Sequence, residues 1–180
     1  MANGGSTTQE MLGRFEGEPD YSDPSGDDFE ALARDRIPVR TLRAEDLPAL
    51  VRIDRRITGC DRSAYYRRKV REALDESGVR VSLVAEQEGE IAGFVMARVD
   101  YGEFGRTDTA AVIDTLGVDP AYVRRGVGYA LLSQLLANLA ALRVETVRTE
   151  IAWNERALGA FLERCGFAPG QRLALTKRLA

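Results

Sequence analysis

Two arginines stand directly before a pair of closely spaced glycines, in the order Arg124, Arg125, Gly126 and Gly128. Residues 110–118, just upstream, are mostly apolar as in a strand, and a helical pattern follows the glycines. Glycine at a helix start lets a ligand approach the backbone closely, and the first N–H groups there carry about half a positive charge. A guanidinium group beside them can pair with a phosphate. This order of residues therefore predicts a binding site for a phosphate or pyrophosphate group.

Two other phosphate-binding loops do not fit this segment. A P-loop would need lysine and then serine or threonine after its second glycine, and neither follows Gly128. A dinucleotide-binding turn would need glycine or alanine in place of Leu131, and it would follow the first strand rather than several. Because two glycines spaced by one residue are common, a helix start with no ligand is the alternative at this point.

The residue types limit the chemistry that is available. The chain has no histidine, so catalytic triads that depend on imidazole are excluded. The two cysteines, Cys60 and Cys165, lack metal-ligand spacing, and we expect neither a metal site nor a disulfide framework. No apolar run approaches the ~20 residues that span a bilayer, and the N-terminus lacks a signal pattern. We therefore expect a cytoplasmic protein with no membrane partner.

The first 36 residues differ in composition from the rest. They carry nine acidic and three basic residues, a net charge of −6, which leaves +3 for residues 37–180. Because glycine and proline interrupt them without any period, we interpret residues 1–36 as a mobile extension, with an acidic partner-binding tail as the alternative. Residues 27–32 could form a short helical turn within it. A charge of +3 is too small for a nucleic-acid-binding surface, so nucleic acid is rejected as a partner.

Regular patterns begin at residue 37 and continue to the end of the chain. Alternating or continuous apolar runs predict strands at residues 37–42, 79–86, 91–100, 110–118, 144–152 and 173–179. Helical periodicity predicts a helix that opens at Glu45 and Asp46, and helices at residues 62–76, 125–142 and 154–164. The order is β-α-α-β-β-β-α-β-α-β. It predicts one α/β domain, also describable as α+β, with a mixed central sheet of six to seven strands and helices on both faces.

The glycine loop and two further segments together resemble the GNAT superfamily of acyl-CoA N-acyltransferases. The family's pyrophosphate loop is usually Gln/Arg-x-x-Gly-x-Gly/Ala. Residues 113–120 are similar to its fourth strand and residues 154–167 to its second conserved block, and the element order from residue 37 corresponds as well.

The resemblance implies direct transfer of an acetyl group from acetyl-CoA to an amine of a protein or small molecule. A non-catalytic acyl-CoA-binding regulatory module is the alternative. Edge strands of such folds often pair between two subunits, so the chain could form a homodimer.

The resemblance also assigns the coenzyme A contacts. The pantetheine arm would bind main-chain groups near Leu116, Gly117 and Val118, and Asn154 would reach the arm or the thioester. The pyrophosphate would bind the residues from the arginine pair onward, namely Arg124, Arg125, Gly126, Val127, Gly128, Tyr129 and Ala130. Core packing is the alternative for the side chains of Leu116 and Val118, and a helix N-cap is the alternative for Asn154.

Two positions depart from the family pattern. The first position of the glycine motif falls on Val123 instead of glutamine or arginine, although a frame that begins at Arg125 satisfies the pattern. Leu162 occupies the position of a tyrosine that, in many members, protonates the leaving thiolate. Either another group protonates the thiolate here, or the thiolate leaves unassisted, which its modest basicity permits.

Two carboxylates are candidates for the base that deprotonates the amine. Asp114 interrupts an otherwise apolar strand beside the expected thioester, where burial would raise its pKa toward a value suited to accepting a proton. Glu150, on the neighbouring predicted strand, is the second candidate. For each of them the alternative is an outward-facing or salt-bridged carboxylate.

Overall fold

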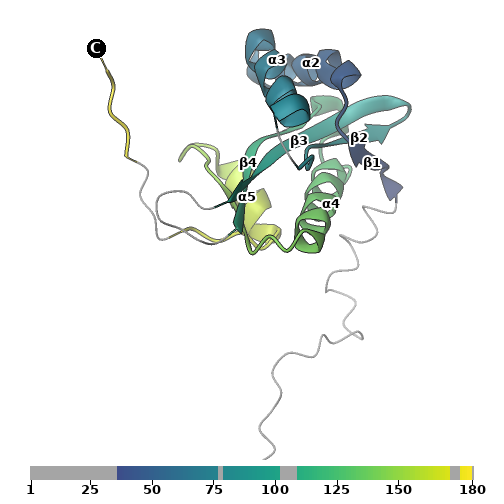
Figure 1. Cartoon of the computed structure of the whole chain (residues 1–180). Coiled ribbons are helices and arrows are strands. Elements are labelled where there is room, and N and C mark those ends of the chain that lie inside the picture. The colour runs from purple at the N-terminus through teal and green to yellow at the C-terminus, as the bar shows by residue number, and fades with distance from the viewer. Residues whose placement is uncertain (1–35, 77–78, 102–108, 171–174, 180) are drawn as a thin grey trace, which may run out of the picture.

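The described part of the chain folds around one mixed sheet of five strands in the order β1-β2-β3-β4-β5 (Figure 1). The computed structural model describes residues 36–76, 79–101, 109–170 and 175–179. Within them the strands are β1 (Val39–Thr41), β2 (Leu83–Gln87), β3 (Glu90–Tyr101), β4 (Thr109–Val118) and β5 (Thr146–Thr149). Neighbouring strands are antiparallel from β1 to β4, whereas β5 runs parallel to β4. The prediction of a mixed sheet is confirmed.

Helices lie on both faces of this sheet, as predicted (Figure 1). The described residues form α2 (Leu47–Thr58), α3 (Ser63–Arg71), α4 (Val127–Ala141) and α5 (Arg156–Arg164), with 3-10 turns at Ala44–Asp46 and Pro120–Tyr122 and a π-helical turn at Glu72–Glu76. The helix expected to open at Glu45 and Asp46 thus begins with a 3-10 turn. The Asp46 carboxylate accepts a hydrogen bond from the Arg43 N–H at 2.7 Å, which fixes this turn.

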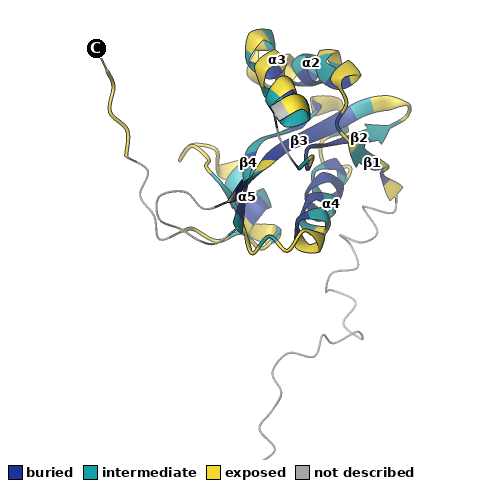
Figure 2. Ribbon diagram, in the orientation of Figure 1, coloured by how far each residue is buried: buried dark blue, intermediate teal, exposed yellow. Residues whose placement is uncertain are grey.

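Each face of the sheet has its own buried apolar cluster, visible as the dark inner surfaces in Figure 2. On one face, Leu50 and Ile53 of α2 and Tyr66 of α3 pack against strand residues such as Phe94. On the other face, α4 packs several leucines against the strands, with Leu131, Leu132, Leu135 and Leu139 all at 1 % exposure or less. The sheet is therefore held from both sides, and its two faces differ in which helices touch them.

The predicted strand at residues 173–179 is wrong, and so is the prediction of six to seven strands. Residues 175–179 have no ladder partner in the described structure, and Leu175 and Leu179 are 91 % and 86 % exposed. In a strand Leu175 and Leu179 would share a face with Lys177, whose charge would oppose burial of that face on a sheet. Residues 173 and 174 lie outside the described residues. The remaining order, β-α-α-β-β-β-α-β-α, is as predicted.

Two further expectations concern the N-terminal extension and membranes. The helical turn expected at residues 27–32 lies outside the described residues, as does the extension before residue 36. In the part of the chain that the structure describes, no helix combines the length and the apolar character needed to cross a bilayer.

Candidate functional site

The second half of β4 lacks a strand neighbour on one side. β4 pairs with β3 along its whole length, from Thr109 opposite Tyr101 to Val118 opposite Gly93. Its pairing with β5 ends at Ile113, which is opposite Thr149. On the β5 side, main-chain groups of residues 114–118 therefore have no ladder partner among the described strands. An extended ligand could bind them as an added strand does.

A β-bulge lies at the point where β4 leaves β5. Met96 of β3 is opposite Thr115, but the next residue, Ala97, is opposite Ile113. Asp114 is therefore an extra residue in β4. Such a bulge bends its strand and increases the local twist, which accounts for the divergence of β4 from β5 at this point.

The loop after β4 is fixed by Asp119, whose side chain is almost fully buried. Its carboxylate accepts hydrogen bonds from the Ala121 N–H at 3.0 Å and from Arg56 of α2 at 2.7 Å, while its own N–H donates to the Ala92 carbonyl at 2.8 Å. Asp119 thus anchors the turn at Pro120–Tyr122 that leads to the glycine segment. The anchoring role of Asp119 was not predicted from the sequence, although aspartate before proline is a known sign of a turn.

Positive backbone angles mark the segment between this turn and α4. Gly126, the N-cap of α4, has φ 86°, and Arg124 has φ 63°, a left-handed conformation that non-glycine residues adopt only at a cost. The Ala130 N–H donates to the Gly126 carbonyl at 2.9 Å. The N–H groups of Val127 and Gly128 precede this bond, so no carbonyl within the helix is available to them. The backbone therefore presents donors at the start of a 15-residue helix.

Gly128 lies in close contact with α5. A Cβ atom at this position would be 3.3 Å from the ring of Phe161, a closer contact than nearly all real side chains make. Val127 and Ala130 are buried at 1 % and 0 % exposure, so their side chains belong to the packed interior. Tyr129 packs edge-on against Phe161, and its hydroxyl accepts a hydrogen bond from Arg164 at 2.9 Å. Side chains at the start of α4 are thus engaged in packing, and a ligand there would meet mainly backbone atoms.

The two arginines of the motif lie on the surface beside this backbone. Arg124 is exposed. Arg125 stacks over the Tyr122 ring at 5.3 Å and pairs with Glu88 at 3.3 Å. Both guanidinium groups are therefore close in sequence to the helix start and reachable from solvent, as an anion partner must be.

The β4 residues named from the resemblance have side chains, or in Gly117 a Cα, that pack against the neighbouring elements. Leu116 and Val118 pack against the α4-side cluster, as their core-packing alternative requires. A Cβ on Gly117 would be 2.7 Å from the Phe94 ring on the opposite face. Side chains on both faces of this part of β4 are thus committed to packing, and the strand edge is what faces outward.

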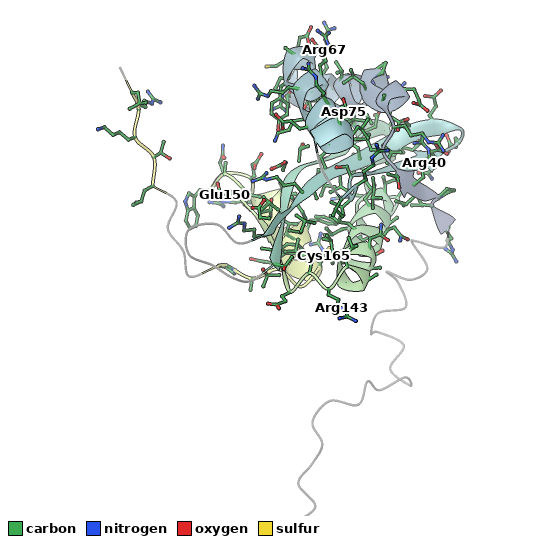
Figure 3. All side chains as sticks on the ribbon, in the orientation of Figure 1. Arg40, Arg67, Asp75, Arg143, Glu150 and Cys165 are labelled. Carbon is green, nitrogen blue, oxygen red and sulfur yellow. The ribbon has the colours of Figure 1, made fainter. Side chains whose placement is uncertain are left out.

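The two candidate bases lie in different environments. Asp114 is largely buried and forms ion pairs with Lys69, at 3.2 Å, and with Arg98. It is the salt-bridged carboxylate of the alternative interpretation. Glu150 directly follows β5, is exposed, and has no hydrogen bond or ion pair to its carboxylate within the described residues (Figure 3).

Two residues of the 154–167 segment differ in role from the family pattern. The N-cap of α5 is Glu155, so the N-cap interpretation of Asn154 is wrong, and Asn154 is an exposed loop residue. Leu162, at the family's tyrosine position, is 6 % exposed within the α4-side cluster. It therefore contributes packing and no proton.

Residues 44–167 match the model of the Acetyltransferase (GNAT) family. A [ribosomal protein bS18]-alanine N-acetyltransferase of Escherichia coli (strain K12) is 28 % identical over 129 residues, which is 72 % of this chain and 79 % of that relative. The crystal structure of the ribosomal-protein-S18-alanine N-acetyltransferase from Escherichia coli superposes with a TM-score of 0.62 at 25 % identity, covering 75 % of this chain and 79 % of that one. The fold is also shared with AAC(6')-Iy in complex with a bisubstrate analog, at a TM-score of 0.67 and 14 % identity over 80 % of this chain and 99 % of that one.

Proposed function

Because the chain belongs to the GNAT family of acetyltransferases, we propose that it transfers an acetyl group from acetyl-CoA directly to an amine. The observation that carries this proposal is the half-paired β4, which leads through a loop anchored by Asp119 into the glycine start of α4. Together they offer an extended backbone edge followed by an anion site. These are the two features that a pantetheine arm and a pyrophosphate require.

The residues present fit coenzyme A in a defined order. The free edge of residues 114–118 would hold the pantetheine arm, and the N–H groups of Val127 and Gly128 would bind the pyrophosphate. Arg124 and Arg125 would add charge-assisted bonds to the phosphates. When bound, acetyl-CoA supplies the activated thioester, and the protein's part is to orient it and to help the amine lose its proton.

The structure favours Glu150 over Asp114 as the base. Two cations neutralise Asp114 and compete for the lone pairs that would accept a proton. Glu150 is unpaired in the described structure and directly follows the strand from which β4 diverges. For a lysine-like amine with a pKa of about 10.4, deprotonation at pH 7 costs roughly 4–5 kcal/mol, whereas an α-amine near 8 needs only about 1 kcal/mol. An exposed carboxylate is better matched to the α-amine.

We infer that the acceptor is the N-terminal α-amine of a protein, in preference to a lysine side chain. One reason is the proposed base, because an exposed carboxylate is better matched to an α-amine than to a lysine side chain. The other is that the Escherichia coli relative is named for transfer to an alanine of a ribosomal protein. A small-molecule amine is the second acceptor class, since a structural neighbour is an aminoglycoside acetyltransferase.

Thiol release from acetyl-CoA tests the proposal. The full chain would be incubated with acetyl-CoA and, in separate reactions, a peptide with a free N-terminal alanine, its N-acetylated form, a lysine-containing peptide and an aminoglycoside. We expect release that depends on the free N-terminal peptide, and none above background with its acetylated control. Tight coenzyme A binding without acceptor-dependent release from any amine would instead support the non-catalytic acyl-CoA-binding module.

A further inference from the structure

Helix α3 contacts the β4 bulge with two side chains from one of its faces. Tyr66 and Lys69 are three residues apart and therefore lie on the same side of the helix. Lys69 pairs with Asp114, the extra residue of the bulge, at 3.2 Å. The Tyr66 hydroxyl lies 3.4 Å from the Thr115 hydroxyl, the next residue along the strand. Both residues of the bulge are thus tied to α3.

Hydrogen bonding fixes the direction of the contact between Tyr66 and Thr115. The Tyr66 hydroxyl donates its proton to the Asp54 carboxylate at 2.9 Å. Since a phenol has only one proton, its oxygen must accept in the second bond, and Thr115 must donate. Asp54, on α2, is in turn held by Arg62 through its Nε at 2.9 Å and through a second guanidinium nitrogen.

Packing holds the Tyr66 ring in one place. Its exposure is 1 %, and it meets the rings of Phe94 and Tyr65 edge-on at 5.6 and 5.1 Å. Burial raises the pKa of Tyr66 to about 12, so the hydroxyl stays protonated at neutral pH. A rigid hydroxyl that keeps its proton can hold the Thr115 side chain in a fixed position. Its burial keeps it from touching a substrate.

We propose that Tyr66, held by Asp54, is a positioning residue that fixes Thr115 and thereby sets the course of the unpaired half of β4. This inference rests on the proposed function, because that half of the strand is the edge assigned to the pantetheine arm. Without the hydroxyl, Thr115 loses its acceptor and the strand can settle into a position less suited to the ligand. The residue would act on coenzyme A affinity through the backbone, with no contact of its own.

Calorimetric titration of coenzyme A into the full chain tests this inference. Tyr66→Phe and Thr115→Val each remove one hydroxyl with little change of shape. Each should raise the dissociation constant for coenzyme A by about threefold to tenfold, the range that corresponds to one net hydrogen bond. The double variant should bind no more weakly than the weaker single variant, because both changes break the same bond. Thr115→Ser, which keeps the hydroxyl, should restore binding.

The matched control is Tyr65→Phe, which removes a neighbouring hydroxyl of the same helix outside the bond to Thr115. It should keep the wild-type dissociation constant. A purely structural role for Tyr66 would lower thermal stability in Tyr66→Phe but leave the dissociation constant within about twofold of wild type, and that result would overturn the inference while the proposed function stands. A wild-type protein that binds no coenzyme A would overturn both.

Discussion

Asp114 and Glu150 are two nearby carboxylates in different environments, the first within β4 and the second just after β5. Asp114 lies in a bulge with Lys69 and Arg98 and stabilises the sheet against α3. Glu150 follows the end of β5 and has no ion pair among the described residues. A base needs a free lone pair, which is why we propose Glu150 rather than Asp114 for this role.

Replacing Glu150 with glutamine should therefore lower kcat for the best amine by about 10²–10⁴-fold at neutral pH, the usual range for loss of a general base. The dissociation constant for coenzyme A should not change, since Glu150 lies outside the proposed phosphate and pantetheine contacts. A pH–rate profile provides the check, because the loss should be smallest at high pH, where the free amine already predominates. Equal profiles for Glu150→Gln and wild type would assign the proton transfer to another group.

The backbone donors proposed for the site could be predicted from the sequence, whereas the side chains that position them could not. Gly126 and Gly128 are recognisable because their type and spacing are local signals. Asp119 and Tyr66 depend on partners 63 and 49 residues away, Arg56 and Thr115, and no local pattern encodes such contacts. The N-cap alternative for Asn154 is wrong because α5 begins at Arg156, two residues after the predicted start of the helix.

At the scale of elements, the crossing of α4 over β3 and β4 depends on a missing side chain. A Cβ on Gly93 would be 2.8 Å from Val127 Cγ1 and 2.9 Å from the Gly117 carbonyl oxygen. A backbone atom cannot rotate away as a side chain can. The α4 start and the β4 edge are thus packed as closely as they are because β3 has glycine at this position.

Gly93→Ala should consequently lower the free energy of unfolding by about 1–3 kcal/mol, the usual cost of overpacking a core. Urea denaturation followed by circular dichroism would measure it. Gly170→Ala is the matched control: a Cβ there would meet nothing within 4 Å, and its effect should stay within about 0.5 kcal/mol. A Gly93→Ala protein as stable as this control would show that α4 does not pack on the sheet as described.

The elements themselves were largely predictable, and the exceptions have a common cause. Periodicity alone gave the order of nine elements from β1 to α5. The strand expected at residues 144–152 is only Thr146–Thr149, because β4 turns away at its bulge and leaves the later residues without a partner. Where a strand ends depends on its neighbour, and the apolar pattern of one segment does not contain that information.

At the scale of the whole molecule, the helices on the two faces of the sheet contact different parts of the proposed site. The α4 side provides the larger buried cluster and the helix start that would bind the pyrophosphate. The α2–α3 side anchors the loop through Arg56 and the bulge through Tyr66 and Lys69. The backbone proposed to bind coenzyme A contacts elements from both faces of the sheet, so its geometry depends on both.

The most direct test of the account is the affinity of coenzyme A for the start of α4. Calorimetry with wild type and Gly128→Val should show a single site in wild type and a loss of at least about tenfold in the variant, since the new side chain would displace Phe161 or occupy the pyrophosphate position. Gly159→Ala is the control, because its Cβ would also come within 3.3 Å of a side chain, that of Ile151, which makes none of the proposed coenzyme A contacts. Equal affinity in wild type and Gly128→Val, or no binding in wild type, would contradict the account.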